Sequence, residues 1–274
     1  MTAEVLSLRL PSPALGRDKR VNVLLPGGYR SSGPGHPVLY LLHGYGGGRN
    51  TWLDHTPLLD LLDEHRLMVV LPESGRRWFV NDHAGLAYED YLVQDLIPAV
   101  DAEFNTLADR SGRAVGGFSM GGAAALYLGL RHRELFGAVA SHAGAFEGPL
   151  RVGDPYAGHR ADPGFVMPDI DSHERVWGPP GSAARHEYDP YRLIRAEHPL
   201  PPPAFYLDVG TGDYERMVRM NRTVRDALRT RGWDPEYHER EGGHDWEFVG
   251  RSLPHALGFV SRRLTGTAPV GAAA

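Results

Sequence analysis

Cysteine is absent from the 274 residues of this chain, and Lys19 is its only lysine. The lack of cysteine excludes disulfides, thiolate metal sites and a cysteine nucleophile. Basic and acidic side chains number 29 and 34, a net charge of −5, and no long run of one sign occurs. Nucleic acid is therefore not an expected partner, because phosphate binding needs a clustered basic surface.

Long apolar runs are missing as well. No run approaches the ~20 residues that a helix needs to span a bilayer. Residues 1–10 alternate like a strand and lack the basic and apolar regions of a signal peptide. We therefore expect a cytoplasmic protein with no membrane partner. Its oligomeric state is not indicated by any feature of the sequence.

Apolar runs alternate with helical patterns along the chain. Strands are expected at residues 4–10, 20–25, 38–42, 67–71, 113–116, 136–141, 205–209 and 237–239. Helices are expected at 51–65, 88–104 with a kink at Pro98, 123–130, 189–198, 217–228 and 246–264. This order predicts one α/β domain over residues 1–274, with a mostly parallel central sheet, helices on both faces and an antiparallel start.

Residues 143–190 interrupt the alternation, being rich in Gly, Pro, Asp, Arg and His without a clear period. A stretch of this length inside a compact domain is typical of a lid or a pocket insertion. Residues 265–274 are expected to form a flexible tail. A metal centre is the alternative for the insertion, but no H-x-x-x-H pair occurs, so neither a metal nor a cofactor is expected. Its candidate ligands are His159, His173, His186, Asp154, Asp162, Asp169 and Asp171.

Ser119 is the centre of a G-x-S-x-G pentapeptide that runs from Gly117 to Gly121, between an expected strand and an expected helix. In this context the serine occupies a sharp turn above the sheet, and the next backbone N–H can point at a developing oxyanion. Small residues are needed on both sides of the turn to avoid clashes. A chance match is the alternative in a chain with 34 glycines, but the strand–helix context favours a nucleophile.

A serine nucleophile needs a histidine base, which in turn needs an acid. In this architecture both follow later strands, in the order Ser, acid, His. Asp213 meets this condition, because it follows the strand at 205–209 and opens a helix. A helix N-cap is the alternative role for Asp213. Asp208, inside the strand, is the main rival for the acid, and Glu215 and Asp234 are weaker candidates.

His244 follows the last expected strand and has two glycines before it, which would allow a close approach to the serine. The chain has 14 histidines, so a structural or surface role is the alternative for each one. His142 follows the strand at 136–141 and is the main rival, with a place in the substrate pocket as its other role. His238 and His255 are expected on a strand and on a helix face.

The second oxyanion donor is expected from the glycine-rich turn at 43–48. We favour the N–H of Tyr45 over that of Gly44, paired with the N–H of Met120. A phosphate-binding loop is the alternative for this turn. It is disfavoured because the turn matches neither G-x-x-x-x-G-K-[ST] nor G-x-G-x-x-G.

Six segments occur in the same order as in the esterase D-like family of α/β-hydrolases, which the chain resembles over residues 20–262. They are 41–47, 78–82, 91–101, 117–122, 210–213 and 243–246. The family includes S-formylglutathione hydrolases, tributyrin-type and feruloyl esterases, and mycolyltransferases. The resemblance implies an α/β-hydrolase fold, a triad of Ser119, Asp213 and His244, and an oxyanion hole formed by Tyr45 and Met120. It also implies a pocket flanked by Trp78, Phe79, Asn81 and Trp246.

The implied activity is hydrolysis of a small carboxylic ester through an acyl-enzyme on Ser119. Formylglutathione hydrolases carry cysteines that this chain lacks, so that substrate is not favoured. Mycolyltransferases are secreted and lack the histidine that stands here as His43. Transfer of the acyl group to a sugar or another alcohol is the first alternative, and a non-catalytic binding protein on the same fold is the second. The acyl and alcohol groups stay open.

Overall fold

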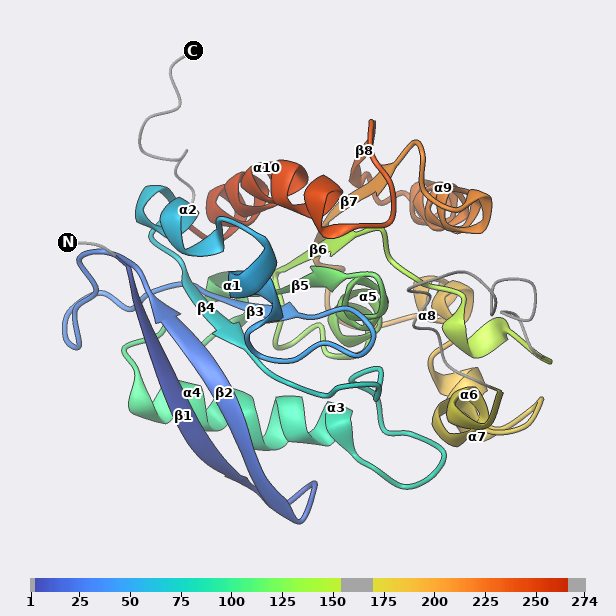
Figure 1. Cartoon of the computed structure of the whole chain (residues 1–274), viewed down its shortest axis with the longest axis horizontal. Helices are drawn as coiled ribbons and strands as arrows, with labels where there is room; N and C mark the ends of the chain where they lie inside the picture. The colour runs from blue at the N-terminus through green and yellow to red at the C-terminus, as the bar shows by residue number, and fades with distance from the viewer. Residues whose placement is uncertain (1–2, 154–169, 266–274) are drawn as a thin grey trace.

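The computed structural model describes residues 3–153 and 170–265. Within this part of the chain the strands form one eight-stranded sheet in the order β1-β2-β4-β3-β5-β6-β7-β8 (Figure 1). β1 pairs antiparallel with β2, and β2 with β4, whereas all later pairs are parallel. The predicted sheet, with its antiparallel start, is confirmed. The strands are β1 (Glu4–Ser12), β2 (Arg17–Leu25), β3 (Val38–Leu42), β4 (Met68–Leu71), β5 (Arg113–Phe118), β6 (Ala138–His142), β7 (Ala204–Gly210) and β8 (Glu236–Arg240).

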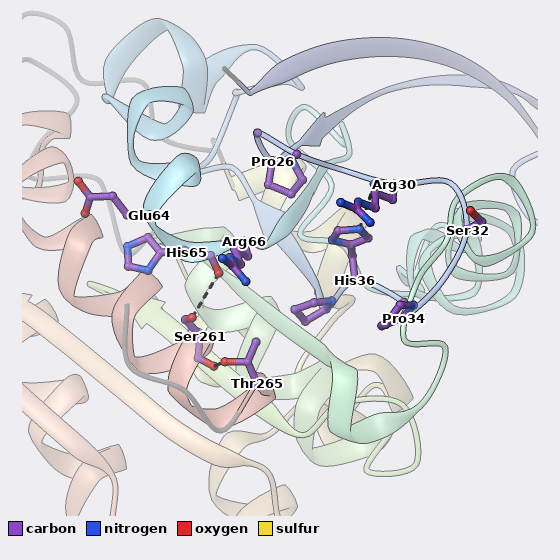
Figure 2. A pocket seen from close by; sticks show the side chains of 14 residues that line it. Pro26, Arg30, Ser32, Pro34, His36, Glu64, His65, Arg66, Ser261 and Thr265 are labelled. Carbon is purple, nitrogen blue, oxygen red and sulfur yellow. Dashed lines mark hydrogen bonds between the residues drawn. The ribbon is translucent and has the colours of Figure 1, made fainter. Parts of the chain in front are cut away.

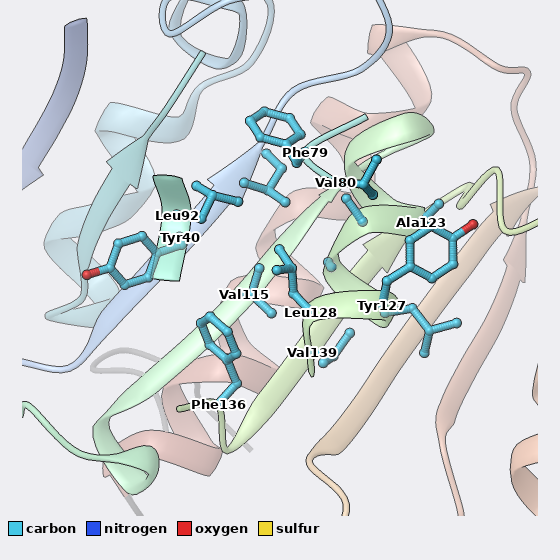
Figure 3. Close-up of a cluster of buried hydrophobic side chains, with 14 of the residues drawn as sticks. Tyr40, Phe79, Val80, Leu92, Val115, Ala123, Tyr127, Leu128, Phe136 and Val139 are labelled. Carbon is cyan, nitrogen blue, oxygen red and sulfur yellow. The ribbon is translucent and has the colours of Figure 1, made fainter. Parts of the chain in front are cut away.

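Helices cover both faces of the sheet, because the inner strands are apolar on both sides. Along β3, Leu39 and Leu41 join one hydrophobic core, while Tyr40 and Leu42 join the other. The first core lies under α1 (Thr51–His55), α2 (Leu58–His65) and α10 (Trp246–Thr265) (Figure 1). The second lies under α5 (Met120–Arg131), α4 (Ile97–Glu103), α8 (Pro190–Arg195) and α9 (Glu215–Thr230). Figure 3 shows part of the second core, where strand residues meet side chains of α5.

The single helix expected at 51–65 is wrong, because the chain forms α1 and α2 with a break between them. Thr56 is extended, with φ −139° and ψ 159°, and Pro57 precedes the first residue of α2. The ring of a proline disfavours a helical conformation at the residue before it. Pro57 therefore explains a break that apolar periodicity alone does not reveal.

The helix expected at 88–104 is present as three joined segments: α3 (Tyr88–Asp90), the π-helix η1 (Tyr91–Leu96) and α4. Pro98 lies in the first turn of α4, directly after the π-helical segment. A proline cannot donate a hydrogen bond and its ring crowds the preceding turn, and a wider turn accommodates both effects. The local response to Pro98 is thus a change of helix type.

The described parts of the insertion contain short helices, namely η3 (Gly148–Leu150), α6 (Ile170–Trp177) and α7 (Ala183–Glu187). Trp177 and Tyr188 are buried and pack against Tyr127 of α5, with ring centroids 6.4 and 5.9 Å away. Residues 154–169 of the predicted lid, and 266–274 of the predicted tail, lie outside the described residues. Among the helices of residues 3–153 and 170–265, none combines the length and the apolar character needed to cross a bilayer.

Candidate active site

Ser119 is the single residue between the end of β5 and the start of α5. Its backbone has φ 55° and ψ −112°, a region in which a residue with a side chain is strained. Hydrogen bonds hold this conformation: the Ser119 N–H donates to the carbonyl of His142 at 2.8 Å, and its own carbonyl accepts from Ala123 and Ala145, both at 3.0 Å. This geometry matches the sharp turn that the pentapeptide predicts.

The glycines of the pentapeptide are needed because backbones meet closely at the turn. A Cβ atom on Gly117 would lie 2.4 Å from the carbonyl carbon of Gly121. A Cβ atom on Gly121 would lie 2.3 Å from the carbonyl oxygen of Leu42, at the end of β3. Glycine therefore lets β3, the turn and α5 approach one another, which presents the Ser119 side chain above the sheet edge.

The three residues proposed as a triad lie together. The Oγ–H of Ser119 donates to Nε2 of His244 at 2.8 Å, and the Nδ1–H of His244 donates to Oδ2 of Asp213, also at 2.8 Å. Asp213 follows β7, and His244 lies between β8 and α10. The Asp213 side chain is fully buried, whereas that of His244 is one-fifth exposed. This arrangement can remove the proton from Ser119 and stabilise the imidazolium that results.

Asp208, the rival acid, belongs to a different pair. Its carboxylate accepts the Nδ1–H of His142 at 2.9 Å, and both side chains are buried. His142 was also expected to line the substrate pocket, but it is not among the residues that line the cavity around Ser119. The physical reason is its place on β6, where its buried ring packs near Trp52 and Tyr206 of the first core.

His43 holds the turn after β3 in place through two hydrogen bonds, a role that was not predicted from the sequence. Its Nδ1–H donates to the carbonyl of Gly44 at 2.7 Å, and its Nε2 accepts the N–H of Ser74 at 3.0 Å. Burial lowers the pKa of His43 from 6.5 to about 4, so the ring is neutral near pH 7 and can serve both partners. A histidine directly after a buried strand and before a glycine-rich turn was the available signal.

The two expected oxyanion donors, Tyr45 and Met120, belong to segments next to Ser119. Met120 is the first residue of α5, so its N–H lies before the first helical hydrogen bond and is directed away from the helix body. Tyr45 lines the cavity that contains Ser119. Tyr45 and Ser119 thus line the same cavity, and Met120 directly follows Ser119 in the chain.

The cavity at Ser119 has a volume of about 160 Å³. It is lined by Gly44, Tyr45, Gly47, Thr51, Phe118, Ser119, His244 and Trp246. Trp246 was expected there and packs edge-on against Phe118, with 5.0 Å between ring centroids, and stacks on His55 at 5.4 Å. Thr51 and Phe118 were missed, although Phe118 is the residue before the serine in the pentapeptide.

Trp78, Phe79 and Asn81 do not line this cavity. Trp78 and Phe79 have positive φ values of 21° and 53° and are buried, with Phe79 among the side chains of the second core (Figure 3). The ring of Phe79 lies 4.9 Å from that of His43 and so packs against the first residue of the turn after β3. Asn81 donates its N–H to the hydroxyl of Tyr188. The three residues are therefore not found at this cavity, although the sequence predicts them in the pocket. The strained turn directs the rings of Trp78 and Phe79 into the protein interior.

A larger hollow of about 700 Å³ lies where β3 and β4 begin, at the opposite edge of the sheet (Figure 2). Arg30, His36 and Arg66 are among the residues that line it. Ligand sites of parallel sheets form at the carboxyl ends of the strands, which is the edge that carries Ser119. Volume therefore does not identify the site here. Within residues 3–153 and 170–265, no group of three or more His, Asp or Glu side chains is placed to hold a metal ion.

Comparison with known proteins identifies the family. The sequence profile of the family described as putative esterase matches residues 12–260. This chain belongs to that family. Esterase Rv1288 of Mycobacterium tuberculosis is 31% identical over 93% of this chain, which spans only 61% of that relative's length. The acetyl esterase of Caldicellulosiruptor saccharolyticus is 27% identical, over 82% of this chain and 83% of its own length.

Solved structures show the same α/β-hydrolase fold. An S-formylglutathione hydrolase from Staphylococcus aureus aligns with a TM-score of 0.80 at 21% identity, over 95% of this chain and 100% of its own. A ferulic acid esterase aligns with a TM-score of 0.77 at 23% identity, over 96% and 99%. The family and fold implied by the sequence are thus confirmed.

Proposed function

We propose that this chain hydrolyses carboxylic esters through an acyl-enzyme on Ser119. The observation that carries the proposal is the continuous hydrogen-bonded series from Ser119 through His244 to Asp213, built on a strained turn. Family membership supports it, since relatives named as esterases align with 82% to 93% of this chain. Serine has no nucleophilic strength of its own near pH 7, so such a series is the feature that ester cleavage requires.

In the first step, Nε2 of His244 takes the proton of Ser119 as Oγ attacks the ester carbonyl. The C–O bond to the alcohol then breaks, and His244 returns the proton to the leaving alkoxide. Water repeats the sequence on the acyl-enzyme and releases the acid. Asp213 holds the ring of His244 and stabilises its cation in both halves of the reaction.

The N–H groups of Tyr45 and Met120 would receive the oxyanion of each tetrahedral intermediate. An oxyanion donor of this kind lowers the activation barrier by about 3 kcal/mol. His43 supports the first of these donors through its bonds to Gly44 and Ser74. It belongs to the site although it does not contact the substrate.

The cavity that the described residues form at Ser119 supports the proposal of a short acyl group. Its volume of about 160 Å³ is well below the roughly 300–1,000 Å³ of sites for drug-sized ligands. Phe118 and Trp246 provide apolar lining, and Gly44 and Gly47 line the cavity without side chains that would fill it. We propose that this space takes the acyl part of the ester and that the alcohol leaves toward solvent.

Acyl transfer is a second candidate, favoured by one comparison. Diacylglycerol acyltransferase/mycolyltransferase Ag85A of Mycobacterium tuberculosis is 28% identical over 97% of this chain and 84% of its own length. Water and an alcohol would compete for the same acyl-enzyme. Product analysis with added glycerol or trehalose separates the two activities, because a transferase gives the new ester and a hydrolase gives the free acid.

The direct test is the rate of p-nitrophenyl acetate hydrolysis by the Ser119→Ala variant. Turnover should fall to the level of the uncatalysed reaction, while the thermal unfolding temperature stays close to that of the unaltered protein. Turnover retained in a folded Ser119→Ala protein would refute the assignment.

A further inference from the structure

A second histidine–carboxylate pair lies behind the nucleophile. His142 ends β6, and Asp208 is its cross-strand neighbour on β7. The Nδ1–H of His142 reaches both carboxylate oxygens of Asp208, at 2.9 and 3.0 Å. The hydroxyl of Tyr206 donates to the same carboxylate at 2.8 Å. These three residues are at most 1% exposed, so the pair is closed to substrate.

The pair holds two strained residues by their backbones. The carbonyl of His142 accepts the N–H of Ser119 at 2.8 Å, and the carbonyl of Asp208 accepts the N–H of Ala143 at 2.7 Å. Ser119 and Ala143 both have positive φ, 55° and 45°. Such conformations persist only where their surroundings over-determine them. Asp208 therefore binds His142 through its side chain and Ala143 through its backbone carbonyl. The backbone carbonyl of His142 in turn binds the N–H of Ser119.

The ring of His142 also supports the wall of the cavity. It lies 6.1 Å from the ring of Trp52, which packs edge-on against Trp246 at 5.1 Å. Trp246 contacts Phe118, and both line the cavity. A displacement of His142 would therefore reach the backbone of the nucleophile and the wall of the acyl pocket together.

Burying a carboxylate is costly unless it is fully hydrogen-bonded, and neither member of the pair touches the reacting atoms. Substrate binding does not explain the pair, since neither residue lines the cavity. A histidine held by a carboxylate keeps one orientation, and here that orientation fixes the carbonyl that receives the Ser119 N–H. A buried pair of this kind can be retained because it specifies one conformation, here that of the backbone at Ser119.

We propose that His142 and Asp208 are positioning residues that hold the backbone of Ser119 in the conformation from which Oγ meets Nε2 of His244. This rests on the ester hydrolysis proposed above. The pair is not a proton relay to Ser119, because its side-chain hydrogen bonds run from His142 through Asp208 and Tyr206 to Arg240. The hydroxyl of Ser119 instead donates to His244.

The test compares three variants by steady-state hydrolysis of p-nitrophenyl acetate over pH 5–9. His142→Leu removes the donor to Asp208, and kcat should fall on the order of 10- to 100-fold with KM changed less than about two-fold. His142→Asn places an amide N–H near the position of Nδ1 and should keep kcat within about three-fold. Tyr206→Phe is the matched control, since it removes another hydrogen bond from the same carboxylate, and its kcat should be unchanged.

Amide hydrogen exchange supplies a readout that needs no catalysis. The Ser119 N–H should exchange faster in His142→Leu than in the unaltered protein, and Tyr206→Phe should not change it. If His142→Leu does not fold because Asp208 is left unpaired, the double variant His142→Leu/Asp208→Leu removes both polar groups and should show the same loss of kcat.

Several results would overturn the positioning role. They are an unchanged kcat in folded His142→Leu, an equal loss in Tyr206→Phe, or a shifted midpoint of the pH profile. Faster exchange at Ser119 in a protein that hydrolyses no ester would instead retain the positioning role and refute the proposed function.

Discussion

Nε2 of His43 accepts the backbone N–H of Ser74 at 3.0 Å, which joins the turn after β3 to the turn after β4. The opposite ring nitrogen donates to Gly44, the residue before the expected oxyanion donor Tyr45. A protonated ring carries hydrogens on both nitrogens and cannot accept from Ser74. The position of this turn at residues 43–48, the proposed oxyanion turn, therefore depends on a neutral His43.

The first prediction concerns stability at low pH. Burial lowers the pKa of His43 from 6.5 to about 4. Between these values the unfolded chain binds a proton that the folded chain does not, so the free energy of unfolding falls as the pH falls from about 6.5 to about 4, by about 3 kcal/mol for this residue. Urea unfolding at pH 7 and pH 4 should show that His43→Asn loses this part of the pH dependence.

His173 provides the control for His43. Burial also lowers its pKa to about 4, but it lies on α6 and donates to the carbonyl of Arg151. His173→Asn should likewise reduce the pH dependence of stability, while ester hydrolysis at pH 7 stays unchanged. His43→Asn should reduce hydrolysis as well. Equal hydrolysis in the two variants would argue against a role of His43 in the oxyanion turn.

The second prediction separates the two buried carboxylates. Asp213→Asn removes the charge that orients and stabilises His244, and kcat should fall on the order of 10³- to 10⁴-fold. Asp208→Asn keeps an acceptor for His142 and can donate to the hydroxyl of Tyr206, so kcat should stay within about ten-fold. Steady-state kinetics of both variants decide the assignment. A greater loss in Asp208→Asn would mean that the acid is misassigned.

The third prediction concerns acyl length. Trp246→Ala removes an aromatic wall of the cavity, so the ratio of kcat/KM for p-nitrophenyl hexanoate to that for the acetate should rise, on the order of ten-fold. His55→Ala is the matched control, because His55 stacks on Trp246 without lining the cavity, and its ratio should stay near that of the unaltered protein. An unchanged ratio in Trp246→Ala would place the acyl group elsewhere.

The fourth prediction concerns packing at the nucleophile turn. Gly121→Ala places a methyl group 2.3 Å from the carbonyl oxygen of Leu42, and backbone on both sides prevents relaxation. Urea unfolding should show a loss of about 2 kcal/mol or more, together with a loss of hydrolysis. Gly48→Ala is the control, because the nearest atom to its new methyl group, on Glu73, is 3.9 Å away. Comparable stability of the two variants would contradict the close packing.

The order of elements and the three candidate triad residues could be predicted from the sequence. Buried parallel strands leave a clear apolar signal, and their carboxyl ends meet at one edge, so Ser119, Asp213 and His244 were expected together. The break at Pro57 was not predicted, because the apolar residues on both sides of it continue one helical period. The burial of Trp78 and Phe79 depends on positive φ values that no residue type indicates there.

The pairing of His142 with Asp208 could not be predicted for a different reason. The two residues face each other only because β6 and β7 pair in one particular register. A shift of one residue would turn either side chain to the opposite face of the sheet. Sequence patterns predict that both strands are buried, but they do not fix this register. His142 therefore looked like a rival base or a pocket residue.

The most direct test of the central claim is mass spectrometry of the protein quenched in acid during turnover of p-nitrophenyl acetate. Trypsin releases residues 114–131, in which Ser119 is the only serine. We predict one acetyl group on this peptide, located at Ser119 and absent from the Ser119→Ala protein. Acetylation of a different residue during turnover, or turnover with no acetylated peptide, would contradict an acyl-enzyme on Ser119.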